Sequence, residues 1–148
     1  MQEYNIVDIS SSFNKSIKQI INCIDMTITN NIMFDTMKRR VKIIIDTNPL
    51  LLLQEGGPYI FEYRDYIKND QFDELFLNTE NILKDNVRNE IKECSDNLGK
   101  EESNNIMSLL LILRDAWKHY SDKEKKLIKK NIKMILSEYC KFLSIDKN

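Results

Sequence analysis

Glycine and proline are scarce in this chain, which contains three glycines and two prolines among its 148 residues. β-Sandwiches and doubly wound α/β folds need many tight turns, and these two residues make most of them. Helices joined by short loops need far fewer. We therefore predict an all-α fold, a compact bundle of about five to seven helices in one domain spanning residues 1–148.

Apolar residues at helical spacing indicate where the helices begin and end. Phe13, Ile17 and Ile24 share one face of a first helix, for which Ser10 to Ser12 offer the N-cap. Residues 1–8 have no clear period, so we expect a loose N-terminal arm there. A second periodic segment predicts a helix that ends near Thr47.

A glycine pair is expected to make the sharpest bend in the chain. Gly56 and Gly57 follow a short apolar turn at residues 50–53, and glycine readily adopts the positive φ values that end a helix. Pro58 suits the first position of the next helix because its missing N–H costs nothing there. That helix is predicted to run to Lys68.

The second half of the chain carries three further helical patterns. After a break at residues 69–70, a half-exposed helix is predicted over 79–94. The stretch near 104–120 is apolar on almost every side, so we predict that it forms the central helix of the bundle. Ser121 and Glu124 match the S-x-x-E capping box and are expected to open the last helix.

Charge and cysteine content restrict the environment of the protein. The 22 basic and 23 acidic side chains leave a formal charge of −1, so no global field attracts the chain to nucleic acid or an anionic membrane. The N-terminus lacks the features of a signal peptide, and no apolar run is long enough to span a membrane. Cys23, Cys94 and Cys140 are odd in number and widely spaced, which predicts three buried thiols and an intracellular, reducing compartment such as cytoplasm or nucleus.

The sequence lacks the residue patterns of catalytic and metal centres. His119 is the only histidine, and a helix-end position favours a structural or surface role for it over pairing with a cysteine nucleophile. No zinc or calcium spacing occurs, and Gly56-Gly57 lacks the lysine of a phosphate-binding loop. We therefore expect no enzymatic activity, no cofactor, no metal and no small-molecule substrate.

Two segments are candidates for binding a partner. The first is an aromatic stretch within residues 50–67, in which helical spacing fits both a core stripe and a protein interface; its members are Tyr59, Phe61, Tyr63 and Tyr66. The second is the last helix, where Lys126, Lys130 and Lys133 share a face that could follow a phosphate backbone. Interleaved Asp122 and Glu124, and the absence of arginine, make nucleic acid the less favoured partner.

The stretch from Asp46 to Ile67, together with Trp117 and Tyr139, resembles small helical proteins encoded by large nucleocytoplasmic DNA viruses. The resemblance covers about residues 35–143 and contains no catalytic motif. It implies a virus-encoded factor that acts in the infected cell or the virus particle.

These observations predict a non-enzymatic protein–protein interaction or structural factor. Its partner could be another protein or a second copy of the same chain, giving a homodimer. A nucleic-acid-binding accessory protein that uses the lysine-rich face of the last helix is the alternative. No membrane association is expected.

Overall fold

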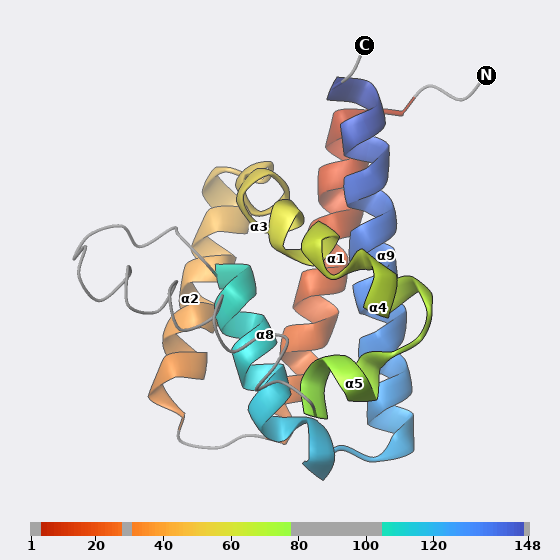
Figure 1. Ribbon diagram of the computed structural model, residues 1–148. Helices are drawn as coiled ribbons and strands as arrows, with labels where there is room; N and C mark the ends of the chain where they lie inside the picture. Colours follow the sequence, from red (N-terminus) through yellow and green to blue (C-terminus); the bar gives the residue numbers. More distant parts are fainter. Residues whose placement is uncertain (1–3, 28–30, 78–104, 147–148) are drawn as a thin grey trace, which may run out of the picture.

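The computed structural model describes residues 4–27, 31–77 and 105–146, and these residues fold entirely into helices and short connections (Figure 1). The elements are α1 (Ile6–Asp25), α2 (Ile32–Thr47), α3 (Leu51–Glu62), α4 (Arg64–Lys68), α5 (Phe72–Leu77), α8 (Asn105–Ala116), the 3-10 helix η1 (Trp117–His119) and α9 (Asp122–Asp146). The all-α prediction is confirmed. The helix predicted over 79–94 lies outside the described residues.

The two longest helices, α1 and α9, form the most extensive helix pair among the described elements. Figure 1 shows them side by side with the two chain termini at the same end, so they run antiparallel. Phe13, Ile17 and Ile20 of α1 and Ile128 and Ile135 of α9 have no exposed surface. Burial of these apolar side chains supplies most of the drive for pairing, because helices gain stability chiefly from packing an apolar face.

Helix α8 is the central apolar helix that the sequence predicts. Its residues Leu109 to Leu113 are all buried, and the helix contacts α2, α3 and α5. It ends at Ala116, and the chain then tightens into η1. A helix that is apolar all round is stable only inside a bundle, which explains its position.

Polar caps mark the N-terminal ends of α1 and α9. The side chain of Asn5 accepts hydrogen bonds from the backbone N–H groups of Val7 and Asp8, at 2.8 and 3.4 Å. This cap starts α1 at Ile6, so the predicted loose arm over residues 1–8 is wrong for its last three residues, and Ser10 to Ser12 lie inside the helix. The Ser121 and Glu124 capping box is confirmed, with reciprocal bonds of 2.8 and 3.2 Å.

Gly56 and Gly57 do not form the predicted bend, because α3 continues through both of them and through Pro58. Both glycines are buried, and neither has a positive φ. A β-carbon at Gly56 would overlap Ile106 of α8, and one at Gly57 would overlap the Tyr139 ring of α9. The glycines therefore allow close approach between helices.

The bend that does occur lies at the predicted break after α4, where Asp70 has a positive φ of 57°. Asparagine and aspartate tolerate this conformation better than most side chains. The turn returns the chain so that α4 contacts α9 and α5 contacts α8 and η1. The α4–α5 segment therefore lies beside the first half of α9.

The described cysteines differ in burial. Cys23 is buried, but Cys140 is half-buried, so the prediction of three buried thiols is wrong for Cys140. That residue lies near the C-terminal end of α9, at the margin of the core. Cys94 lies outside the described residues. No helix that the structure describes is both long enough and apolar enough to cross a membrane.

Candidate functional site

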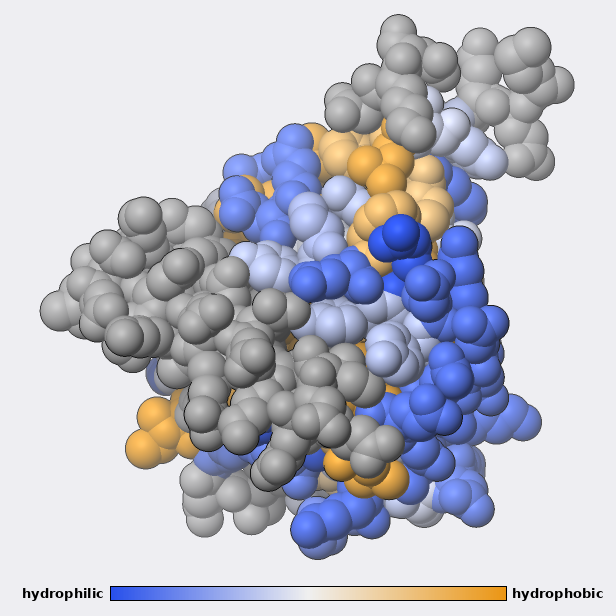
Figure 2. Space-filling model, in the orientation of Figure 1, coloured by the Kyte–Doolittle hydropathy of each residue, from blue (hydrophilic) through white to orange (hydrophobic). Residues whose placement is uncertain are grey.

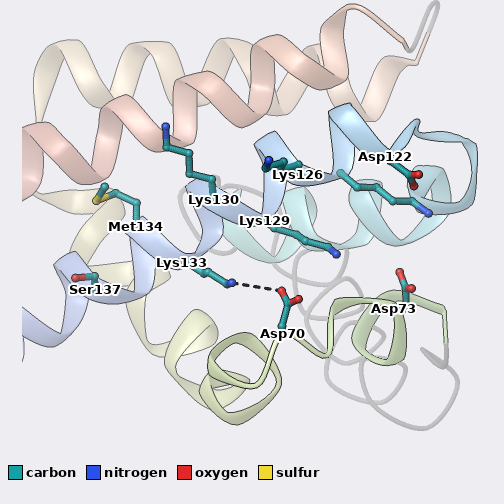
Figure 3. A pocket seen from close by; sticks show the side chains of 10 residues that line it. Asp70, Asp73, Asp122, Lys126, Lys129, Lys130, Lys133, Met134 and Ser137 are labelled. Carbon is teal, nitrogen blue, oxygen red and sulfur yellow. Dashed lines mark ion pairs between the residues drawn. The ribbon is translucent and has the colours of Figure 1, made fainter.

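A lysine-rich face of α9 forms one wall of an open groove on the surface of the bundle (Figure 3). The groove has a volume of about 810 Å³. Its opposite wall is the turn between α4 and α5 together with the start of α5. The residues of this lysine groove are Asp70, Asp73, Asp122, Lys125, Lys126, Lys129, Lys130, Lys133, Met134 and Ser137.

Helical spacing explains why five lysines gather in this groove. Lys125, Lys129 and Lys133 follow one another at intervals of four residues, and Lys126 and Lys130 form a parallel row. Apolar positions between them, such as Ile128 and Ile132, face the core instead. The amphipathic pattern of α9 thus divides one buried face from one cationic face.

The two lysine rows differ in direction. Figure 3 shows Lys129 and Lys133 pointing toward the α4–α5 turn, where Asp70 lies, and Lys130 pointing away from it. Lys133 forms an ion pair with Asp70 at 3.3 Å, and both side chains are about half exposed. Such exposed pairs contribute little to folding stability, so Lys133 can exchange its partner at small cost.

Buried aromatic rings lie beneath Lys125, Lys129 and Lys133, which we call the inner row; Lys126 and Lys130 form the outer row. The Nζ atom of Lys125 is 5.4 Å from the centre of the Trp117 ring, and those of Lys129 and Lys133 are 5.8 and 5.9 Å from the Phe72 ring. These distances fall within the range of cation–π attraction. Phe72 and Trp117 are fully buried, so their rings support the lysine side chains and are closed to a ligand.

Four of the five lysines have no carboxylate partner among the described residues. Within the part of the chain that the structure describes, Lys125, Lys126, Lys129 and Lys130 form no ion pair. The Asp73 carboxylate accepts a hydrogen bond of 2.8 Å from Trp117 Nε1. Five lysines and three aspartates line the groove, so its described lining has an excess of positive charge, although the whole chain carries a formal charge of −1.

The aromatic stretch that the sequence proposes as an interface is largely occupied by packing. Tyr63 is buried, so its ring belongs to the core and cannot be a surface contact; Tyr59, Phe61 and Tyr66 are half-buried. The Phe61 ring meets the Tyr139 ring edge-on at 5.9 Å, and the Arg64 guanidinium lies 4.3 Å from the Phe61 ring. A protein contact through the three half-buried rings stays a prediction.

The surface differs in hydropathy between the two ends of α9. Figure 2 shows hydrophilic surface along the side of the molecule that α9 occupies and orange, hydrophobic surface near its C-terminal end. Phe142, Leu143 and Ile145 at that end are half-buried. The lysine groove is thus the strongly charged part of the helix.

A second groove of about 650 Å³ lies between α1 and the turn that joins α2 to α3. Its wall includes the exposed Val7, the half-buried Ile45 and Leu50, and the buried Asn14. Asn14 Nδ2 donates a 2.8 Å hydrogen bond to the Pro49 carbonyl, which ties the turn to α1. The hydrogen bond across this groove is a packing contact between the turn and α1.

The described titratable groups outside the groove include one histidine and one buried thiol. His119 is exposed at the end of η1. Burial, and to a smaller extent the Glu124 carboxylate, raises the pKa of the Cys23 thiol, which opposes a nucleophilic thiolate. Among residues 4–27, 31–77 and 105–146, no three His, Cys, Asp or Glu side chains are grouped to hold a metal ion.

The described residues form an all-α fold with a lysine-rich groove on its surface. Comparisons with protein-family models, with curated proteins and with solved structures find no match to this chain. The groove itself therefore provides the basis for proposing a function.

Sequence reasoning found part of this groove. Lys126, Lys130 and Lys133, proposed as nucleic-acid contacts, all line it. Asp70, Asp73 and the buried rings beneath the inner lysines were missed, because they come from the α4–α5 turn, α5 and η1, which are distant from most of α9 in sequence. The spacing of Lys125, Lys129 and Lys133 was a readable signal for the inner row.

Proposed function

We propose that this protein is a non-enzymatic interaction factor that docks an acidic segment of a protein partner in the lysine groove. The observation that carries the proposal is the open groove with five lysines, four of which have no carboxylate partner among the described residues. Complementary charge steers association and fixes the register of a partner. A row of Asp or Glu side chains supplies this complement.

An acidic protein fits this groove better than a nucleic acid does. Asp70, Asp73 and Asp122 line the same groove and repel carboxylates as well as phosphates, so they do not distinguish the two partners. The rings beneath the lysines are buried, so they offer no stacking platform for bases. None of the described lining residues is an arginine, whose guanidinium suits carboxylates and phosphates equally, so this absence favours neither partner. Nucleic acid is therefore the alternative ligand, and the experiment must distinguish it from an acidic protein.

The test compares two charge-reversed variants of the full chain with equal net charge. K126E/K130E reverses the outer row of the groove, and the control K15E/K18E reverses two exposed lysines of α1 outside it. Fluorescence anisotropy would measure binding of a labelled poly-L-glutamate, a single-stranded oligonucleotide and a duplex, each at two salt concentrations. Circular dichroism would check that both variants remain folded.

We expect poly-L-glutamate to bind the wild-type chain and the control, and to lose at least about tenfold in affinity for K126E/K130E. Binding should weaken with salt because the contacts are exposed. Tighter binding of an oligonucleotide with the same variant dependence would replace the proposal with a nucleic-acid-binding function. Equal binding by both charge-reversed variants would refute any role of the groove.

The partner protein could also be a second copy of the chain, as the sequence analysis predicts. Size-exclusion chromatography with light scattering tests this homodimer directly, and a strict monomer would remove it. The viral origin and the intracellular location stay predictions.

A further inference from the structure

Two apolar side chains are exposed on the cationic side of α9. Leu127 and Met134 keep 43% and 41% of their surface accessible, and Met134 lines the lysine groove. They are seven residues apart, so they lie on the same face of α9, about 10.5 Å apart along its axis. Exposed apolar residues inside a charged surface are candidates for partner contacts.

Lys130 links this apolar pair to the charged rows. It follows Leu127 by three residues and precedes Met134 by four, so it neighbours both on the helix surface. Lys126 belongs to the same row as Lys130 and has no carboxylate partner in the described part of the chain. The surface therefore combines a narrow apolar stripe with a cationic margin along one side.

We infer that the docked segment is an acidic amphipathic helix, whose apolar residues contact Leu127 and Met134 and whose carboxylates pair with Lys126, Lys130 and Lys133. This inference rests on the proposed function, because it specifies the partner of the same groove. Amphipathic helices recognise such surfaces through anchors at helical spacing. The carboxylates beside the apolar face of such a helix complement the charge of the groove lysines.

The spacing of the apolar pair favours a helix over an extended segment. A partner helix repeats the same face every seven residues, so its anchors also lie about 10.5 Å apart. In an extended strand, side chains on one face recur about every 6.6–6.8 Å, which does not match this interval. Only the helical partner places two anchors on Leu127 and Met134 together.

Two synthetic peptides of identical composition test this inference. The first places leucines at positions i, i+3 and i+7 of a helix with glutamates between them; the second has the same residues in an order without helical amphipathicity. Anisotropy would measure the affinity of each for the wild-type chain, for L127S/M134S, for K126E/K130E and for K15E/K18E. Circular dichroism would follow helix formation by the peptide on binding.

The wild-type chain and K15E/K18E are expected to bind the amphipathic peptide about tenfold tighter than the scrambled one, with a gain in helicity. L127S/M134S should bind both peptides equally, because only the apolar contacts are lost. K126E/K130E should bind both weakly. Since all six substituted side chains are exposed, the variants should keep the wild-type Tm.

The outcomes separate the two proposals. Equal binding of both peptides to the wild-type chain would overturn the helical partner and leave the acidic docking surface intact. Failure of the wild-type chain to bind either peptide would overturn the proposed function itself. Discrimination that persists in L127S/M134S would overturn the assignment of the apolar stripe.

Discussion

The ring of Tyr139 lies against the backbone of α3 at Gly57, in the space that a β-carbon at position 57 would fill. Ile106 occupies the equivalent space beside Gly56. These contacts bring α9 and α8 close to α3 from two directions. The glycine pair thus allows α3 to pack closely against both α8 and α9.

Substitution of Gly57 by alanine should destabilise the fold. Within a helix, alanine in place of glycine usually adds roughly 0.5–1 kcal/mol of stability. Overpacking against the Tyr139 ring costs about 1–3 kcal/mol, so the free energy of unfolding is expected to fall by up to about 2.5 kcal/mol. Urea denaturation measures this change in the free energy of unfolding.

A double-mutant cycle isolates the contact between Gly57 and the Tyr139 ring. In a Y139V background the ring is absent, so G57A should become neutral or stabilising. A stabilising effect of G57A in the presence of Tyr139 would show that the ring moves aside freely, contrary to the tight packing described above.

The hydrogen bond from Trp117 Nε1 to Asp73 should contribute measurably to stability. D73A leaves this indole N–H without its 2.8 Å partner and is expected to cost about 1–2 kcal/mol, since Trp117 is fully buried. D73N keeps an acceptor and serves as the control with a smaller loss. The fluorescence of Trp117, the only tryptophan, would report the change during denaturation. Equal losses in the two variants would contradict this role.

Alkaline pH should weaken the fold partly through Tyr120. Burial raises the pKa of the Tyr120 hydroxyl above its ordinary value of 10.0, while a hydrogen bond with Thr27 acts in the opposite direction. Above pH 10 the unfolded chain ionises this group first, so the unfolded state binds fewer protons and stability falls as pH rises. The decline in wild-type stability should be steeper than that of Y120F. Identical slopes would contradict the raised pKa.

The two described cysteines should differ in reactivity. Cys23 is buried and its pKa is raised by burial, whereas Cys140 is half-buried. In a C94S background, a thiol reagent should modify Cys140 at least about tenfold faster than Cys23 under native conditions. Urea should remove the difference. Loss of the fast phase in C23S, and not in C140S, would reverse this assignment.

The sequence alone determined most of the helices and their buried faces. Periodic apolar residues such as Phe13, Ile17 and Ile24 predict α1 because a 3.6-residue repeat places them on one side of a helix. The Ser121 and Glu124 capping box located the start of α9, since its bonds join residues three apart. Both signals are local, so they can be read along the chain.

The tertiary structure decided what local signals leave open. Gly56 and Gly57 are equally compatible with a turn and with close helix packing, and only the positions of Ile106 and Tyr139 select packing. Likewise, the α9 lysines follow from helical spacing, but their groove needs the aspartates of the α4–α5 segment. Contacts between distant residues depend on how helices pack, and no single segment encodes that arrangement.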